Sequence, residues 1–166
     1  MAPVPAENEL GEAVLFRADT QYHRITVTEG DGARHLRFDH SHQSAISIDD
    51  PYESRIRYPD YMHLAMALDP DAERVLVLGL GGGAITKRFW RDYPGVSVDS
   101  VEIDPVVVDV ARKYFWLPED ERSQVFVEDA RRYVGGLQAA GGTEMQPALA
   151  HALNLLQDSA GVPLVV

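Results

Sequence analysis

The stretch Arg74–Trp90, RVLVLGLGGGAITKRFW, carries the strongest pattern in the sequence. Its apolar run, Val75–Leu78, leads into a cluster of glycines, and the residues from Ala84 onward have the composition of a helix. A fully apolar strand is typical of a parallel sheet covered on both faces. Glycines let the backbone turn tightly and approach a ligand, and the first N–H groups of a helix attract a negative group. The stretch therefore predicts a nucleotide-binding turn between a strand and a helix.

This glycine turn is compatible with three interpretations. Gly79, Gly81 and Ala84 satisfy G-x-G-x-x-A, the spacing of nicotinamide dinucleotide sites. S-adenosyl ligands use the same kind of turn without a pyrophosphate. A tight turn without a ligand is the third interpretation, although the three consecutive glycines of Gly81–Gly83 exceed what a turn needs.

The residues that follow repeat the order of strand and helix. We expect strands over 96–104 and 123–130, and between them a helix over 105–116. Asp104 is placed to cap that helix and Pro105 to occupy its first turn. Strands that alternate with helices in this way predict a doubly wound α/β unit with a parallel sheet.

The residues before the glycine turn have a different character. Four short runs alternate apolar and polar residues, at 13–18, 22–30, 33–39 and 44–49. They predict an antiparallel sheet from about Val14 to Ile48, with Gly30 and Gly32 supplying positive φ in a hairpin turn. A helix from about Pro59 to Leu68 should follow.

Carboxylates stand where the predicted parallel strands end. Glu102 and Asp104 close the second strand, about 20 residues beyond the glycines, where an acidic residue suits the hydroxyls of a ribose. Glu102 is the better ribose candidate, because Asp104 also suits the helix cap. Asp129 closes the third strand, where it can accept a hydrogen bond from an exocyclic amine of a purine or cap the next helix.

Composition narrows the function. The chain has 166 residues and a net charge of −11, which argues against nucleic-acid binding. The basic cluster KRFWR, residues 87–91, is explained as a solvated helix face. No apolar run suits a membrane span and no secretory signal is present, so we expect a cytoplasmic protein. With no cysteine, and with the histidines of residues 35–42 split between strand faces, no metal site is predicted.

From Gln21 to Val134 the chain resembles the spermidine synthase family of polyamine aminopropyltransferases. The order of the motifs carries the resemblance: TQYHRITV, LRFDHSHQSA, DDPYESRIRYP, VLVLGLGGGAITKRF, VEIDPVVVDVARKYF and VEDARRYV. It implies an N-terminal β-region followed by a Rossmann-like sheet of the S-adenosylmethionine-dependent methyltransferase type, here truncated. It also implies a homodimer. The ligand implied is S-adenosylmethionine, its decarboxylated form or methylthioadenosine, together with a polyamine.

The resemblance assigns site residues by position. Those of the nucleoside site are Gln43, Gly79, Gly81, Gly82, Gly83, Glu102, Asp104, Asp129 and Ala130. Gly82 stands where the family's loop carries an aspartate that helps bind the aminopropyl end of the donor. On the polyamine side, His23 replaces a glutamine, Tyr52 replaces a histidine, and Glu53 keeps the family's acid.

The catalytic group is unknown. In the family an acidic segment after the third strand supplies the carboxylate base, and this segment is missing. A base is chemically necessary because a protonated amine has no lone pair with which to attack the carbon beside the sulfonium.

The chain therefore divides into four predicted parts. These are a disordered lead-in at 1–13, a β-rich region at 14–58, a methyltransferase-like nucleoside-binding domain at 59–134 and a tail at 135–166 of different character. The tail resembles a fragment of a von Willebrand factor A domain, in which Thr143 would be the metal-adhesion threonine, but the matching D-x-S-x-S loop is absent. A helix from about Met145 to Gln157 and a final strand are expected there.

Three functions follow from these patterns. The leading hypothesis is a spermidine synthase-like domain that binds an S-adenosyl-type nucleoside, in a family that transfers an aminopropyl group to an amine. The second is a non-catalytic nucleoside-binding or oligomerisation module, which the missing base favours. The third is an NAD(P)-dependent enzyme, for which no hydride-transfer site is visible.

Overall fold

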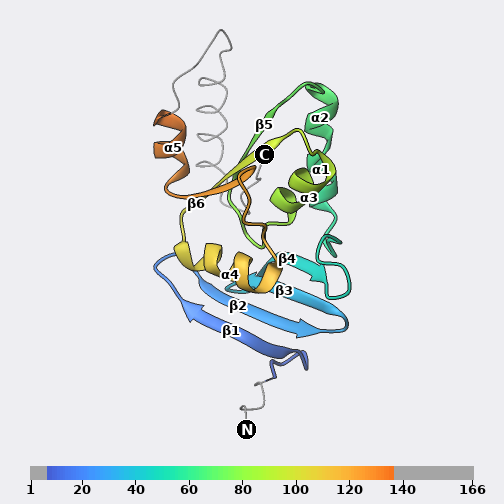
Figure 1. The fold of residues 1–166 in the computed structure, drawn as a ribbon. Helices are drawn as coiled ribbons and strands as arrows, with labels where there is room; N and C mark the ends of the chain where they lie inside the picture. Colours follow the sequence, from blue (N-terminus) through green and yellow to red (C-terminus); the bar gives the residue numbers. More distant parts are fainter. Residues whose placement is uncertain (1–6, 137–166) are drawn as a thin grey trace.

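The computed structural model describes residues 7–136, which form two sheets with helices (Figure 1). Residues 1–6 and 137–166 lie outside the described residues. The first six residues of the predicted lead-in, the predicted tail helix, the predicted final strand and Thr143 therefore lie outside them as well. No helix in the described part is long and apolar enough to cross a membrane.

The first sheet is antiparallel, as its alternating sequence predicts. Its strands are neighbours in chain order: β1 (Ala13–Asp19), β2 (Arg24–Gly30), β3 (Ala33–Phe38) and β4 (Ser41–Ser47). The predicted hairpin joins β2 to β3, where Gly30 pairs with Ala33 across a two-residue turn. The prediction for Gly30 is wrong, since the positive φ angles belong to Asp31 (51°) and Gly32 (71°). Positive φ at both central residues is what a type I′ hairpin turn requires.

The second sheet is parallel and has the strand order β5-β6-β7. Its strands are β5 (Arg74–Leu78), β6 (Ser97–Glu102) and β7 (Ser123–Val127). The helices are α1 (Tyr58–Met62), α2 (Leu64–Leu68), α3 (Ala84–Asp92), α4 (Pro105–Phe115) and α5 (Ala130–Gly136). The helix predicted before the glycine turn is thus two short helices that meet at His63. The predicted α/β class is confirmed.

Helix α4 lies between the two sheets (Figure 1). On one side Val107, Val110 and Phe115 share a buried cluster with apolar residues of β2, β3 and β4. On another side Val108 and Ala111 pack with residues that flank the parallel sheet. Because α4 has apolar residues on both sides, a sheet can pack against each side. The helix therefore joins the two sheets into one packed unit.

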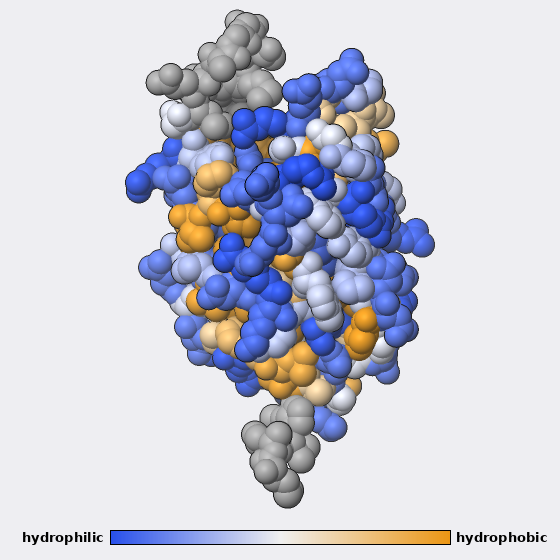
Figure 2. Space-filling model, viewed as in Figure 1, coloured by the Kyte–Doolittle hydropathy of each residue, from blue (hydrophilic) through white to orange (hydrophobic). Residues whose placement is uncertain are grey.

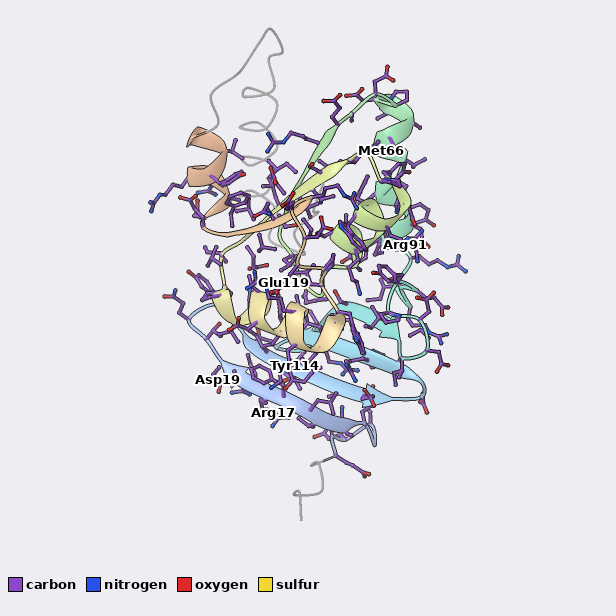
Figure 3. The ribbon with its side chains drawn as sticks, viewed as in Figure 1. Arg17, Asp19, Met66, Arg91, Tyr114 and Glu119 are labelled. Carbon is purple, nitrogen blue, oxygen red and sulfur yellow. The ribbon has the colours of Figure 1, made fainter. Side chains whose placement is uncertain are left out.

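The end of α4 is also tied to the first strand. Tyr114, labelled in Figure 3, packs its ring against Phe16 with centroids 5.8 Å apart. Its hydroxyl donates a hydrogen bond of 3.4 Å to the carbonyl of Leu15. The antiparallel sheet is therefore held against the helix that leads from β6 to β7.

Candidate functional site

The glycine turn has the backbone that its sequence predicts. Gly79, Gly81 and Gly83 have φ angles of 92°, 54° and 70°, in the left-handed region that favours glycine. The N–H of Gly79 donates to the carbonyl of Val101 at 2.8 Å, which fixes the turn to β6. Gly83 is the residue from which α3 begins. The alternating glycines are therefore required by the turn itself, and the close approach of a ligand remains a prediction.

Glu102 lies beneath this turn and is bonded to it. Its Oε2 accepts a hydrogen bond from the N–H of Leu80 at 3.0 Å, and its Oε1 accepts one from the N–H of Asp104 at 3.1 Å. The residue is 8% exposed. An ionised carboxylate has about four acceptor positions, so two remain for hydroxyl groups of a ligand. Glu102 is thus held in one orientation with acceptor capacity to spare.

Asp104 caps α4, as the sequence predicts. Its Oδ1 accepts from the N–H of Val106 at 2.9 Å. Its Oδ2 accepts from the hydroxyl of Thr20 at 2.6 Å, and the residue is 1% exposed. Since Thr20 lies between β1 and β2, this carboxylate joins the antiparallel sheet to the start of α4. These contacts are structural, and the place of Asp104 in the nucleoside site stays a prediction.

We expect Thr20→Val to destabilise the fold by about 1–3 kcal/mol, because it leaves a buried carboxylate oxygen of Asp104 without a donor. Urea unfolding followed by circular dichroism would measure this loss. Thr26→Val is the matched control, because the side chain of Thr26 makes no hydrogen bond among the described residues, and it should change stability by no more than about 0.5 kcal/mol. Equal losses in both variants would contradict the role given to Thr20.

Asp129 lies on the neighbouring strand end. Val127, the last residue of β7, pairs with Glu102, and the N–H of Glu128 donates to the carbonyl of Glu102 at 3.0 Å. The Oδ1 of Asp129 accepts from the N–H groups of Arg131 and Arg132 at 3.0 and 3.2 Å, so it caps α5. Its side chain is exposed, and Ala130 begins the helix half-buried. Glu102 and Asp129 therefore lie at the same end of the parallel sheet, where its strands have their carboxyl ends.

The antiparallel sheet reaches the glycine turn through β4. The hydroxyl of Ser44 accepts a hydrogen bond of 2.8 Å from the N–H of Gly82, and both residues are buried. A Cβ on Gly82 would lie 2.7 Å from the Cβ of Ser44, so glycine is needed at this contact. Gln43 precedes Ser44 and is half-buried, and its carbonyl accepts from the hydroxyl of Tyr58 at 3.2 Å. The structure thus brings Gln43 into the neighbourhood of the turn.

The three predicted polyamine-side residues are not gathered together. His23 stacks on Phe38, and its backbone bonds to Thr20, which reaches the first turn of α4 through Asp104. Tyr52 stacks on Trp90 of α3, beside Arg91, and Glu53 is exposed.

The loop that carries Tyr52 and Glu53 is fixed to the opposite end of α4. Lys87 donates from Nζ to the carbonyls of Pro51 at 2.6 Å and Phe115 at 2.7 Å. At 1.5 Å per residue, α4 separates its two ends by about 16 Å. His23 therefore lies far from Tyr52 and Glu53.

Lys87 contradicts the sequence interpretation of its basic cluster. The residue is 1% exposed, so it does not belong to a solvated helix face. Burial lowers the pKa of its ammonium group from 10.5 to about 8. Both of its hydrogen-bond acceptors are distant in sequence, so no local pattern signals this position.

Two apolar residues at the strand ends are further candidates that the sequence interpretation missed. Ile103, which follows β6, is 39% exposed, and Val127, the last residue of β7, is 53% exposed. Ile103 follows Glu102 in the sequence, and Val127 pairs with Glu102 across the sheet. Both residues therefore flank the predicted ribose site. Exposed apolar side chains beside convergent polar groups suit the flat face of a base. Their position at the carboxyl ends of parallel strands is the signal that could have found them.

The described residues offer polar groups for a nucleoside and no cluster for a metal. Within 7–136, no three histidine, aspartate or glutamate side chains lie close enough to hold an ion. The groups that lie together at the carboxyl ends of the parallel strands are the glycine turn, Glu102 and Asp129. The apolar residues Ile103 and Val127 lie beside them. Such an edge can accept hydrogen bonds from hydroxyl and amine groups of a ligand.

Comparisons with known proteins place this chain in a family. The sequence pattern of the spermine/spermidine synthase domain matches residues 56–143, which is just over half of the chain. The polyamine aminopropyltransferase of Vibrio vulnificus (strain CMCP6) is 32% identical over 127 residues, which are 73% of this chain and 42% of the relative.

Solved structures agree on the fold. The spermidine synthase from Thermotoga maritima superposes with a TM-score of 0.62 at 23% identity, over 73% of this chain and 42% of that protein. A spermidine synthase in complex with the transition state analogue AdoDATO gives a TM-score of 0.61 at 24% identity, with the same shares covered. The chain thus spans less than half the length of these relatives. By its sequence pattern, the chain belongs to the spermine/spermidine synthase family.

Proposed function

We propose that this chain binds an S-adenosyl-type nucleoside at the carboxyl ends of β5, β6 and β7. The observation that carries the proposal is Glu102, a buried carboxylate that is already bonded to the glycine turn and keeps free acceptor positions. In this arrangement Glu102 accepts hydrogen bonds from the ribose hydroxyls. Ile103 and Val127 flank the base, and Asp129 accepts from its exocyclic amine. Family membership supports this ligand over a nicotinamide dinucleotide.

The reaction that fits the family is aminopropyl transfer to a polyamine. The amine nitrogen forms a bond to the carbon beside the sulfonium, the carbon–sulfur bond breaks and leaves a neutral thioether, and the amine proton passes to a base. The chain binds the nucleoside of this reaction. Decarboxylated S-adenosylmethionine is the sulfonium that donates the aminopropyl group, methylthioadenosine is the thioether that remains, and S-adenosylmethionine is a further candidate ligand of the same site. Tyr52 and Glu53 are the proposed polyamine contacts. A homodimer and a cytoplasmic location belong to the same proposal and rest on the family resemblance.

Calorimetric titration with S-adenosylmethionine, its decarboxylated form, methylthioadenosine and NAD tests the ligand. We expect an S-adenosyl compound to bind, and Glu102→Gln to weaken its binding by about 10- to 100-fold, because hydrogen bonds to a charged group contribute about 1.5–3 kcal/mol. Glu119→Gln is the matched control, because Glu119 is exposed and pairs with Arg112. Preference for NAD, or equal affinity in both variants, would refute the proposed site.

A further inference from the structure

The antiparallel sheet carries a group of polar side chains on the face turned away from α4. Val27 and Leu36 belong to the other face, because they share a buried cluster with residues of α4. Since side chains alternate along a strand, the residues next to these two lie on the face away from α4. Strand pairing places Thr28 beside His35, and Arg37 beside His42. Together with a carboxylate that precedes β1 they form what we call the outer cluster: Glu12, Thr28, His35, Arg37 and His42.

Glu12 and Arg37 form the centre of the outer cluster. The carboxylate accepts from both ends of the guanidinium group, at 2.9 Å from Nη1 to Oε2 and at 3.0 Å from Nη2 to Oε1. Both side chains are 12% exposed. Burial raises the pKa of Glu12, but hydrogen bonds from Arg37, Thr28 and Asn8 outweigh it and lower the pKa to about 2. Glu12 therefore stays ionised at every pH at which a histidine titrates.

The same carboxylate belongs to the turn that precedes β1. The Nδ2 of Asn8 donates to Oε2 of Glu12 at 2.7 Å, and the Oδ1 of Asn8 accepts from the N–H of Glu12 at 2.9 Å. The N–H of Asn8 donates to the carbonyl of Glu12 at 2.9 Å. We call residues 8–12 the N-terminal turn. Because Glu12 is part of this turn, its ion pair with Arg37 attaches the turn to the sheet.

His42 completes the outer cluster only as a neutral ring. The Nε of Arg37 donates to the Nε2 of His42 at 3.2 Å. A guanidinium group has donors only, so this Nε2 must offer a lone pair and the ring proton must lie on Nδ1. Protonation of Nε2 would remove the acceptor and place a second positive charge beside Arg37. Figure 2 shows hydrophilic residues at the lower end of the molecule, where this sheet lies in Figure 1, and His42 is exposed there to the protons of the solvent.

His35 is neutral for a different reason. Its Nδ1 is buried without a hydrogen-bond partner among residues 7–136, and its Nε2 lies 3.6 Å from Oε1 of Glu12, beyond hydrogen-bond distance. A protonated ring carries two N–H groups, and the one on Nδ1 would be buried and unpaired, which is costly. The rings of His35 and His42 meet edge to face with their centroids 5.5 Å apart, so a charge on one opposes a charge on the other.

The surrounding charges do not offset these costs. Burial lowers the pKa of both histidines below the ordinary value of 6.5, and the charge of Arg37 lowers both further. Glu12 acts in the opposite direction on both rings, and Asp31 does so on His35, but the net direction is downward. The two rings therefore bind protons more readily once the cluster has opened. Lowering the pH through 6.5 accordingly favours the open form.

We propose that the outer cluster is an acid-sensitive attachment of the N-terminal turn to the antiparallel sheet. With both histidines neutral, Arg37 holds Glu12 and the turn lies on the sheet. With both protonated, His42 repels Arg37, and His35 gains water at Nδ1 only when the packing around it opens. The turn is then released, while the other face of the sheet stays packed on α4. This inference does not depend on the proposed ligand.

Nuclear magnetic resonance of the full 166-residue chain tests the protonation states. At pH 7.5 the ring nitrogens of His42 should show the proton on Nδ1, because Nε2 accepts from Arg37. His35 should titrate at a lower pH than His40, an exposed histidine outside the cluster.

Hydrogen exchange of the same chain tests the release. Between pH 7.5 and 5.5, the protection factors of the Asn8 and Glu12 amides should fall about tenfold, which is the factor that corresponds to one pKa unit. The amide of Val98 is the internal reference, because it is bonded to the carbonyl of Arg122 in the parallel sheet and should keep its protection.

Substitutions assign the effect to the outer cluster. The double variant His35→Gln, His42→Gln has no titrating ring in the cluster, and glutamine can accept from Arg37 at either pH. Its N-terminal turn should be equally protected at pH 7.5 and 5.5. His40→Gln is the matched control and should lose protection as the wild type does. Glu12→Gln removes the charge that Arg37 holds, and it should leave the turn unprotected at both pH values. Circular dichroism of each variant checks that the fold is kept.

Four results would overturn the proposal. The first is a proton on the Nε2 of His42 at pH 7.5. The second is a His35 that titrates at the same pH as His40 or higher. The third is equal protection of the turn at both pH values in the wild type. The fourth is a double variant that loses as much protection as the wild type does.

Discussion

Gly82→Ala is expected to destabilise the protein by about 2–3 kcal/mol, the upper part of the range of about 1–3 kcal/mol for inserting a carbon into a packed site. The added Cβ would lie 2.7 Å from the Cβ of Ser44, 2.9 Å from its Oγ and 3.0 Å from the ring of Phe115. Ser44 lies in the middle of β4 and cannot move away without disturbing the sheet. Urea unfolding followed by circular dichroism measures the effect.

Gly95→Ala is the control, because a Cβ at Gly95 meets no atom within 4 Å. It should change stability by no more than about 0.5 kcal/mol. A second test adds Ser44→Gly, which removes the Cβ that collides with the new methyl group. In that background Gly82→Ala should be less harmful by about 1 kcal/mol or more, a coupling expected of residues in contact. Additive effects would show that Ser44 is not what excludes a side chain at this position.

The same contact bears on ligand specificity. Gly82 stands where the spermidine synthase family has an aspartate. Introducing an aspartate at this position is therefore an obvious way to test the donor site. The structure predicts that Gly82→Asp fails for a steric reason, because its Cβ meets the same atoms of Ser44 and Phe115. Loss of nucleoside binding in this variant would therefore report on packing. Glu102→Gln is the better probe, since it keeps the volume of the side chain.

The fold follows from local patterns wherever an element has a regular environment. The alternating runs before residue 48 predict an antiparallel sheet because each strand has a buried and a less buried face. The apolar strand before Gly79 predicts a parallel sheet because both faces of such a strand are covered. Asp104 predicts the start of α4 because a helix cap is a local hydrogen bond. The proximity of Glu102 and Asp129 is also predictable, since the carboxyl ends of parallel strands lie on the same side of the sheet.

The rest of the site depends on contacts between distant residues. Ser44 and Gly82 are 38 positions apart, and nothing in either neighbourhood signals their hydrogen bond. Lys87 is assigned to solvent by its charge, yet its partners Pro51 and Phe115 are 36 and 28 positions away. The separation of His23 from Tyr52 has the same origin, because the placement of α4 between the sheets decides it. Sequence patterns specify elements, while these contacts depend on how the elements pack.

Stability should rise with pH through the titration of Lys87. Its pKa in the folded protein is lowered by burial to about 8, below the 10.5 of an exposed lysine. Below pH 8 both states are protonated, and the folded state bears the full cost of a buried charge. Between pH 8 and 10.5 the unfolded state binds more protons than the folded state, so the free energy of unfolding increases with pH.

The expected size of this effect is roughly 2–3 kcal/mol between pH 7 and 10, since one pKa unit corresponds to about 1.4 kcal/mol. Urea unfolding of the wild type and of Lys87→Met at each pH isolates it, because other titrating groups are common to both proteins. As the pH rises, the free energy of unfolding of the wild type should increase relative to that of Lys87→Met.

Lys113→Met is the control, because Lys113 is the only other lysine of the chain and is exposed. This variant should follow the wild type at every pH. A flat difference between wild type and Lys87→Met would mean that the two carbonyls, of Pro51 and Phe115, compensate the buried charge and hold the pKa of Lys87 near its ordinary value. In that case Lys87 would act as a permanently charged link between α3, α4 and the loop after β4.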